Sequence, residues 1–247
     1  MSEVEISDEI IQRIKNSSHT VVMTGAGVSA ESGVPTFRDA QTGLWAQYEP
    51  TELATPEAFQ RDPKLVWDWY ASRRETVLSV KPNPGHFALA QLGQLIEKMT
   101  LITQNVDGLH QAAGSPDVIE LHGSIMRAKC FQCLAVSKGW PDDSKHQPPK
   151  CQLCEGLMRP DVVWFNESLP RQAILEAAQA VEQCDLFFSI GTSSMVHPAA
   201  SFAFTAVENQ ATVIEINPTE TPLTPEANFV LSGPSGKILP RIVERCR

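Results

Sequence analysis

Short runs of consecutive apolar residues alternate along this chain with longer segments of helical periodicity, and this alternation is the feature that most restricts its fold. Such runs are typical of strands that are buried on both faces of a parallel sheet, with helices covering each face. The sequence therefore predicts an α/β fold, a Rossmann-like parallel sheet with helices on both sides. The expected strands are Thr20–Thr24, Met99–Thr103, Val118–Leu121, Val162–Phe165, Leu186–Ile190 and Thr212–Ile216. The expected helices are Glu5–Lys15, Pro84–Lys98, Pro170–Glu182, Pro198–Glu208 and Gly236–Arg245.

Two stretches break the alternation and predict a smaller domain inserted into the first. Leu44–Val80 has the pattern of helices and loops, and Gly123–Arg159 carries four cysteines around a polar, proline-rich middle. We expect the inserted domain to consist of a helical module over residues 44–80 and a zinc-binding module over residues 123–159. The Rossmann-like domain would then comprise residues 1–43, 81–122 and 160–247.

Four of the six cysteines form two Cys-x-x-Cys pairs, Cys130/Cys133 and Cys151/Cys154, with seventeen residues between the pairs. This spacing lies within the four-cysteine zinc pattern. The first ten residues hold four acidic side chains and no basic one, unlike a secretory signal, so metal binding is favoured over disulfides. Four thiolates would close a tetrahedral site, so we expect one structural Zn²⁺ per chain. The alternative is four free thiols whose spacing arose by chance.

The acidic balance of the chain excludes one class of partner. Its 247 residues include 29 acidic and 20 basic side chains, a formal net charge of −9. Sequence-independent binding of nucleic acid relies on a basic surface, so nucleic acid is not an expected partner, whereas lysine-rich peptides are compatible. No run of 18 apolar residues predicts a membrane span, and a cytoplasmic location is the expectation. The sequence does not indicate an oligomeric state.

A glycine-rich motif, Gly25-Ala26-Gly27-Val28-Ser29-Ala30, directly follows the first expected strand. It fits the G-x-G-x-x-G/A fingerprint of dinucleotide binding, in which glycines let the backbone approach a pyrophosphate. An ordinary tight turn between a strand and a helix is the alternative. The acidic residue that dehydrogenases place about 20 residues further on is missing, because the chain continues instead as Gly33-Val34-Pro35-Thr36-Phe37-Arg38-Asp39. A dinucleotide is expected, but not in the ordinary arrangement for hydride transfer.

Polar residues follow the other expected strands, and parallel strands bring such ends to one edge of the sheet. They are Thr103–His110, Leu121–Gly123, Gly191–Ser193 and Asn217–Thr219. His122 has the chemistry of a general base, although a lone histidine is also common as a structural residue. Tyr70 and Arg73, three residues apart on one helix face, could receive a carboxylate or form a solvated surface pair.

Together these motifs resemble the sirtuin family of NAD-dependent protein-lysine deacylases over nearly the whole chain, from Val21 to about Val243. The residues that carry the resemblance run from Gly25 to Arg38, from Thr103 to Asp107 and from Leu121 to Gly123, with the paired cysteines and Gly191–Ser193 following in order. The resemblance implies that acylated lysine peptides and NAD are converted to free lysine, nicotinamide and O-acyl-ADP-ribose.

The resemblance also implies roles for individual residues. His122 would be the general base, Asn105 and Asp107 would hold the ribose and carboxamide, and Phe37 would shield the reactive carbon. The glycine loop, Ser193 and Arg38 would hold phosphates, and Asn217–Thr219 with Ser235 would line the adenosine end. Val162–Glu167 would pair with the peptide as an added strand, with Val163 and Phe165 in contact with substrate. The implied cofactor-binding set is Gly25, Ala26, Gly27, Ala30, Glu31, Pro35, Thr36, Phe37, Arg38, Trp45, Gln104, Asn105, Asp107, Gly191, Thr192, Ser193, Asn217, Pro218, Thr219 and Ser235.

Three residues resemble the class III branch of the family, which removes acidic acyl groups such as succinyl and malonyl. They are Tyr70 and Arg73, and Ala54, a small residue that would leave a roomy acyl pocket. One departure is Asn166, where the family usually has glycine; asparagine tolerates the left-handed backbone that such a turn requires. Two alternatives remain open, a zinc-stabilised NAD dehydrogenase and a non-catalytic zinc protein that binds NAD or ADP-ribose.

Overall fold

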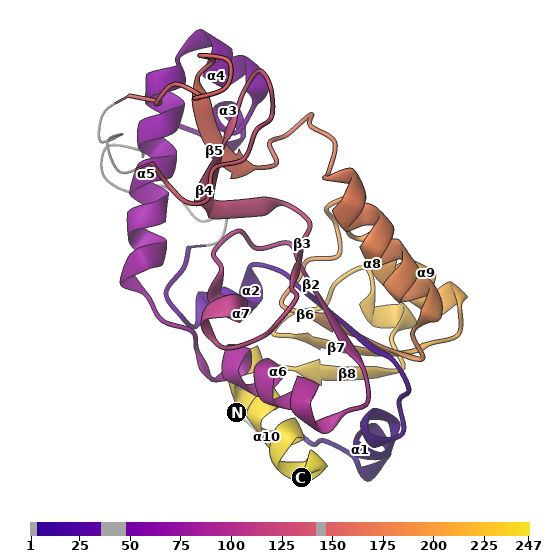
Figure 1. Cartoon of the computed structure of the whole chain (residues 1–247). Coiled ribbons are helices and arrows are strands. Elements are labelled where there is room, and N and C mark those ends of the chain that lie inside the picture. The colour runs from indigo at the N-terminus through magenta and orange to yellow at the C-terminus, as the bar shows by residue number, and fades with distance from the viewer. Residues whose placement is uncertain (1–3, 36–47, 142–146) are drawn as a thin grey trace.

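The structure is a computed structural model that describes residues 4–35, 48–141 and 147–247. Its centre is a six-stranded sheet in the order β3-β2-β1-β6-β7-β8, in which all neighbouring strands are parallel. The fold is therefore the predicted Rossmann-like α/β architecture (Figure 1). The strands are β1 (Thr20–Thr24), β2 (Met99–Thr103), β3 (Ile119–Glu120), β6 (Leu186–Ile190), β7 (Thr212–Asn217) and β8 (Phe229–Ser232).

Helices cover both faces of this sheet because its strands are apolar on both sides. Along β1, Val22 belongs to one apolar core, while Val21 and Met23 belong to the other. The first core is closed by α1 (Asp8–Lys15), α6 (Pro84–Leu95) and α10 (Ser235–Cys246). The second is closed by α8 (Arg171–Gln183) and α9 (Ser201–Glu208). Short helices α2 (Gly27–Ala30) and α7 (Leu109–Ala112) follow β1 and β2, and a 3₁₀ turn, η2 (Thr224–Glu226), precedes β8.

Local sequence signals set the helix ends. The Asn83 side chain accepts a hydrogen bond from the Gly85 amide at 2.9 Å, and Pro84 occupies the first turn of α6, as the sequence predicts. The same pattern begins α5 (Pro63–Ser79), where Asp62 accepts from the Leu65 amide at 3.0 Å. These caps satisfy backbone amides that have no partner within the helix.

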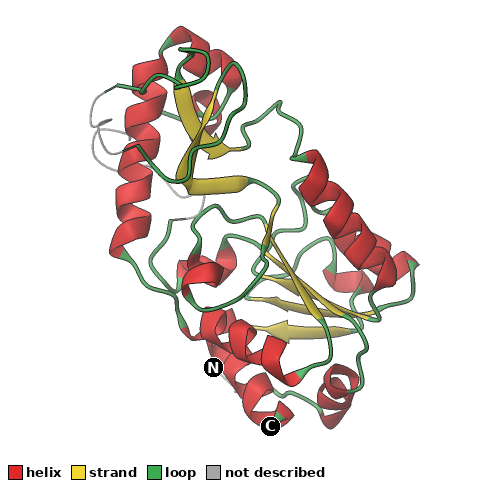
Figure 2. Cartoon of the chain, in the orientation of Figure 1, coloured by secondary structure: helices red, strands yellow, loops and turns green. Residues whose placement is uncertain are grey.

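A second group of elements lies beyond the carboxyl edge of the sheet (Figures 1 and 2). It combines a two-stranded antiparallel sheet, β4 (Gly123–Cys130) with β5 (Met158–Val162), and the helices α3 (Pro50–Leu53), α4 (Pro56–Arg61) and α5. Phe59, Trp69 and Trp164 form the centre of its apolar core. The boundary expected at residue 159 falls inside β5, so the strand pair continues into the following segment.

Two expectations for strands differ from the structure. The run Val162–Phe165 is not a strand of the parallel sheet: β5 ends at Val162, and the next three residues enter a turn at the edge of a cavity. Val162 and Trp164 are buried in the core of the smaller group of elements and not in the central sheet, whereas Phe165 is exposed. The edge strand β8 was not expected, because its residues alternate between buried and exposed and form no continuous apolar run.

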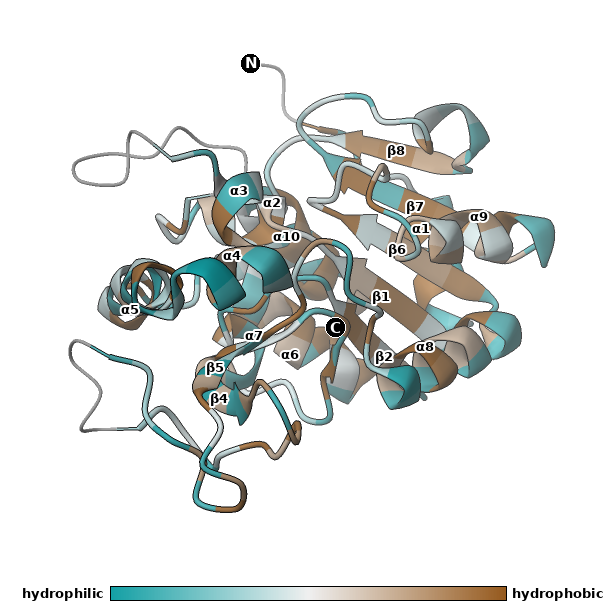
Figure 3. Cartoon of the chain, turned by 90° about the horizontal axis from the view of Figure 1, so that it is seen from above, coloured by the Kyte–Doolittle hydropathy of each residue, from teal (hydrophilic) through white to brown (hydrophobic). Residues whose placement is uncertain are grey.

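Hydropathy follows this architecture (Figure 3). The central strands are predominantly apolar, while the helices that flank them carry polar residues on their outer sides. Within the described residues, no helix combines the length and apolar character needed to cross a membrane.

Candidate functional site

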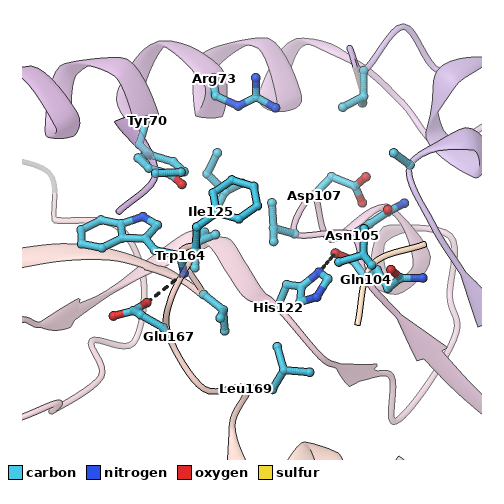
Figure 4. A pocket seen from close by; sticks show the side chains of 18 of the residues that line it. Tyr70, Arg73, Gln104, Asn105, Asp107, His122, Ile125, Trp164, Glu167 and Leu169 are labelled. Atoms are coloured by element: carbon cyan, nitrogen blue, oxygen red, sulfur yellow. Dashed lines mark hydrogen bonds between the residues drawn. The ribbon is translucent and has the colours of Figure 1, made fainter. Parts of the chain in front are cut away.

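A cavity of about 590 Å³ lies between the carboxyl edge of the parallel sheet and the smaller group of elements (Figure 4). Its sheet side carries polar residues that follow β1, β2 and β3, among them Ser29, Asn105 and His122. Its opposite side is lined by α5 and by the turn after β5. Eleven of the residues singled out from the sequence line it: Ala26, Pro35, Ala54, Tyr70, Arg73, Gln104, Asn105, Asp107, His122, Val163 and Phe165.

His122 is half-buried in the wall of this cavity, two residues after β3 ends. Its Nδ1 lies 2.8 Å from the main-chain oxygen of Gln104. Because a carbonyl oxygen only accepts, Nδ1 carries the hydrogen and the neutral ring keeps a lone pair on Nε2. Burial lowers the pKa of the His122 imidazole, although the hydrogen bond to Gln104 opposes this shift. The ring is therefore neutral near pH 7, which is the form a general base requires.

Ser29 connects two of the polar residues at this edge. Its hydroxyl donates to Asp107 Oδ2 at 2.7 Å and accepts from the Asn105 amide at 3.1 Å. His86 Nε2 lies 3.3 Å from the same hydroxyl, and its Nδ1 accepts from the Asn83 amide at 3.2 Å. Burial raises the pKa of the Asp107 carboxyl, while the Leu109 amide and Ser29 oppose the shift. The network holds an amide and a carboxylate at fixed positions beside the cavity.

The glycines of the fingerprint bring the ends of β1 and β6 together. A Cβ atom on Gly25 would lie 2.9 Å from the Gly191 oxygen, and one on Gly27 would lie 2.8 Å from the Gly191 Cα. Gly191 has a positive φ of 59°, and its own Cβ would meet the Val28 amide nitrogen at 2.5 Å. Only glycine fits at these crossings, so the motif has a packing function in addition to any contact with a phosphate.

The other described residues of the implied cofactor-binding set lie outside this cavity, and those expected at the adenosine end, Asn217–Thr219 and Ser235, follow β7 and begin α10. Thr192 accepts a hydrogen bond from the Gln104 amide at 3.0 Å, and Asn217 donates to the Thr219 oxygen at 2.8 Å. Ser235 is buried, and its hydroxyl has no hydrogen-bond partner among the described residues. A hydroxyl in this state is available to a ligand. Beside Ser235, Glu31 accepts from the Gly236 amide at 2.7 Å. The remaining residues of this set are Gly25, Gly27, Ala30, Gly191, Ser193 and Pro218, none of which lines the cavity.

The far wall of the cavity carries a hydroxyl and a guanidinium group on one face of α5 (Figure 4). Tyr70 is 3% exposed, and its ring centroid lies 6.3 Å from that of Trp164. Burial raises the pKa of the Tyr70 hydroxyl, and nearby Arg73 opposes the shift, so the phenol stays protonated and can donate. The Arg73 guanidinium lies 5.2 Å from the Trp69 ring centroid, and Ala54 adds a small side chain to the same cavity.

The turn after β5 connects the two walls. The Val163 amide donates to the His122 oxygen at 2.9 Å, and the Phe165 amide donates to the Ala54 oxygen at 2.9 Å. Asn166 has a positive φ of 66°, so asparagine does adopt the left-handed conformation expected of it. This turn places the candidate peptide-binding residues directly beside the candidate base.

The four paired cysteines converge away from the cavity. Their sulfur atoms all lie within 4.8 Å of one another, with Cys130 Sγ 3.4 Å from Cys154 Sγ and Cys133 Sγ 3.7 Å from Cys151 Sγ. Tetrahedral zinc with bonds of about 2.3 Å would separate its sulfur ligands by about 3.8 Å, so the arrangement fits the ion. Backbone amides of Gln132 and Leu153 point at sulfur at 3.3 and 3.4 Å.

Sequence reasoning missed part of the cavity, and part of its prediction lies outside the described residues. Thr36, Phe37, Arg38 and Trp45 are in the latter group. The cavity-lining residues that were not singled out include Ile125, Leu169 and the segment 196–198, and Trp164 entered only as part of the range Val162–Glu167. Nothing in their local sequence sets them apart from ordinary core or loop residues, since they reach the cavity only through packing between distant segments.

Residues 25–198 match the profile of the Sir2 family. The NAD-dependent protein deacylase of Methylococcus capsulatus is 47% identical over 251 residues, covering 99% of this chain and 98% of that protein. The NAD-dependent protein deacylase 1 of Pseudomonas aeruginosa is 46% identical over 243 residues, covering 96% of this chain and 97% of that protein.

Solved structures are similar over the same length. A Sir2 homologue in complex with NAD has a TM-score of 0.92 and 44% identity, covering 100% of this chain and 96% of that one. A complex of Sir2 with a p53 peptide and NAD⁺ has a TM-score of 0.82 and 31% identity, covering 96% of this chain and 97% of that one. The similarity therefore extends across both the parallel sheet and the smaller group of elements.

Proposed function

The chain belongs to the Sir2 family and is an NAD-dependent protein deacylase, and from this premise we propose that it prefers lysine acyl groups that end in a carboxylate. Succinyl-lysine and malonyl-lysine are the substrates expected to react fastest, with acetyl-lysine as a slower one. The observation that carries the proposal is a single cavity with His122 on one wall and Tyr70 and Arg73 on the other.

His122 is the proposed general base. With Nδ1 donating to Gln104, the Nε2 lone pair is free to accept a proton from a ribose hydroxyl of the cofactor. NAD⁺ supplies an electrophilic ribose carbon and nicotinamide as its leaving group. The products would be nicotinamide, O-acyl-ADP-ribose and an unmodified lysine.

Asn105 and Asp107 are proposed to hold the ribose and the nicotinamide carboxamide, because Ser29 fixes both at the sheet edge. The strand ends that carry Gly191, Ser193 and Asn217 would hold the phosphates and the adenosine, with Ser235 beside them. The unpaired hydroxyl of Ser235 and the amides and hydroxyls at these ends form a donor set that fits a dinucleotide.

Arg73 is proposed to bind the distal carboxylate of the acyl group, and Tyr70 to donate a second hydrogen bond to it. A guanidinium fork matches the planar geometry of a carboxylate, and a protonated phenol adds a donor. Ala54 leaves room for the longer acyl chain. An acetyl group has no carboxylate and gains nothing from either residue.

The peptide around the modified lysine is proposed to pair with the backbone of Val163–Phe165 as an added strand. A related Sir2 structure contains a p53 peptide, which supports a peptide substrate here. The four cysteines are proposed to hold one structural Zn²⁺ that stabilises the β4–β5 pair. We also propose that residues 44–80 and 123–159 act as one substrate-binding domain set into the Rossmann-like domain.

The direct test is a panel of one lysine peptide that carries acetyl, malonyl, succinyl or glutaryl groups, followed by mass spectrometry with and without NAD. We expect loss of the acidic acyl groups to be fastest and to require NAD. Equal rates on acetyl and succinyl peptides would contradict the acyl preference. Conversion of NAD to NADH would favour a dehydrogenase, and binding without nicotinamide release would favour a non-catalytic reader.

A further inference from the structure

Arg159 on β5 is a buried cation beside the peptide-binding turn, with 1% of its surface exposed. Its guanidinium forms a two-pronged ion pair with Glu167, Nη1 to Oε1 at 2.5 Å and Nη2 to Oε2 at 2.9 Å. Nη2 also donates to the Val162 oxygen at 2.6 Å. Arg159 therefore connects the end of β5 at Val162 to Glu167, five residues further along the chain.

The same pair holds Trp164 from two sides. The Trp164 amide donates to Glu167 Oε2 at 2.8 Å, which closes the turn across Asn166. The Arg159 guanidinium carbon lies 3.1 Å from the centroid of the Trp164 ring. Trp164 is 2% exposed and lines the cavity beside Tyr70 (Figure 4). Its indole position thus depends on both members of the pair.

The charges around the pair favour its ionised form. Burial alone would raise the pKa of the Glu167 carboxyl, but the hydrogen bonds from Arg159 and the Trp164 amide hold it below its ordinary value. Lys129 and Asp161 are the next charged groups, joined to each other at 3.6 Å. A buried pair of this kind contributes little net stability, although removing one partner is costly. The main structural consequence of the Arg159–Glu167 pair is therefore the geometric restraint of the turn.

The turn that the pair restrains is hydrogen-bonded to the segment of the proposed base and to that of the proposed acyl pocket. Val163 is hydrogen-bonded to the His122 backbone, and Phe165 to the Ala54 backbone. We propose that Arg159 and Glu167 are positioning residues, which keep the peptide-binding turn and the Trp164 wall in register with His122 and the acyl pocket. The inference rests on the proposed function, and it assigns the pair to substrate binding and not to NAD binding.

The geometry calls for arginine and not merely for a positive charge. A planar guanidinium can bind both oxygens of Glu167, donate to a carbonyl and stack on an indole at once. A lysine ammonium is a point charge that cannot do all three. Arg159→Lys should therefore keep the charge balance and still lose part of the restraint.

The test is a set of variants measured for the KM of an acylated peptide and, separately, for the KM of NAD. For Glu167→Gln we expect kcat/KM for the peptide to fall by about 10- to 100-fold, mostly through KM, with the KM of NAD within about 3-fold of wild type. Arg159→Lys should show a smaller change of the same kind. Asp161→Asn is the matched control, since Asp161 lies on β5 like Arg159 but forms its ion pairs with Arg127 and Lys129 on β4.

The double variant Arg159→Met/Glu167→Gln separates positioning from stability. The double variant leaves no unpaired buried charge. Its melting temperature should therefore be closer to wild type than that of Glu167→Gln, while its KM for the peptide stays raised. Recovery of both would overturn the proposal, as would equal changes in both KM values. If Glu167→Gln does not fold, the double variant carries the test. If the wild-type protein showed no NAD-dependent deacylation, the proposed function itself would be refuted. If the wild type were active and the variants kept its peptide KM, only this inference would be refuted.

Discussion

The imidazole of His122 and the main-chain oxygen of Gln104 are joined by a hydrogen bond of 2.8 Å that selects which ring nitrogen carries the proton. Gln104 directly follows β2 and His122 follows β3, so the bond also ties two neighbouring strand ends together. The orientation of the His122 ring is therefore set by the backbone at the sheet edge and does not depend on a flexible side-chain partner.

His122→Ala should leave a folded protein that still binds NAD and deacylates about 10²–10⁴-fold more slowly, the usual contribution of a general base. The measurement is kcat/KM on an acylated peptide together with calorimetric binding of NAD. His110→Ala is the control: His110 is buried, and its Nε2 lies 2.9 Å from Thr24 Oγ1, so its loss should act mainly on stability. A larger loss of activity in the His110 variant would refute the assignment of the base.

Arg73→Met should remove most desuccinylation and leave deacetylation within a few-fold of wild type. A hydrogen bond to a charged group contributes about 1.5–3 kcal/mol, which corresponds to a loss of roughly 10- to 150-fold in kcat/KM. Arg73→Lys should restore only part of the rate, because a point charge lacks the planar fork. The measurement is kcat/KM on matched acetyl and succinyl peptides. Equal losses of kcat/KM on the acetyl and succinyl peptides would mean that Arg73 supports the fold and does not select the acyl group.

Cys151→Ala should lower the melting temperature, release the bound zinc and reduce activity as a consequence. Three thiolates hold zinc poorly, and a structural zinc contributes directly to folding free energy. Cys184→Ala is the matched control, since Cys184 is also buried but lies outside the cysteine cluster. Zinc content by elemental analysis and thermal unfolding are the measurements. A zinc-free Cys151 variant with unchanged stability would contradict a structural ion.

Asp185→Asn should destabilise the protein near neutral pH and much less in acid. Burial raises the pKa of the Asp185 carboxyl, but hydrogen bonds from Ser17, Ser18 and the His19 amide outweigh it and lower the pKa to about 2. The depressed value means that the stabilisation is present above about pH 4 and is lost as the pH falls toward 2. Because the side chain is largely exposed, we expect about 1 kcal/mol, or about 2–4 °C in melting temperature.

The check for Asp185 is thermal unfolding of both proteins between pH 7 and pH 3. The difference in melting temperature should shrink as the pH falls. Glu9→Gln, which breaks an exposed pair with Arg13 at 3.6 Å, should show little difference at any pH. A constant difference for Asp185→Asn across the range would mean that its charge is not the cause.

The parallel sheet could be predicted because its central strands are buried on both faces and so appear as unbroken apolar runs. The edge strand β8 lacks that signal, since only one of its four residues is buried. The run Val162–Phe165 carries the signal for another reason: Val162 and Trp164 are buried in the core of the smaller group of elements, and the run borders the cavity. A one-dimensional pattern records burial but does not record which core a residue joins.

The chemistry at strand ends could be predicted for a similar reason, because parallel strands place their carboxyl ends together. The far wall of the cavity could not be derived from periodicity. Ile125 and Trp164 reach it only after β4 and β5 pair and dock on α5, a contact between segments far apart in the chain. Arg159 offered even less indication, since a buried arginine looks like a surface residue until its partner is known.

One side of helix α5 lines the cavity with Tyr70, Arg73, Thr76 and Val77. Trp67, on another side of the helix, packs in the core cluster that contains Cys130 and Cys151. The cavity-lining residues at the carboxyl ends of β1, β2 and β3, such as Ser29, Asn105 and His122, lie outside this helix. The residues proposed to select the acyl group and those proposed to carry the chemistry therefore belong to separate stretches of sequence. If the proposed roles hold, substitutions within residues 70–77 would change the preferred acyl group without altering the residues proposed to bind the cofactor.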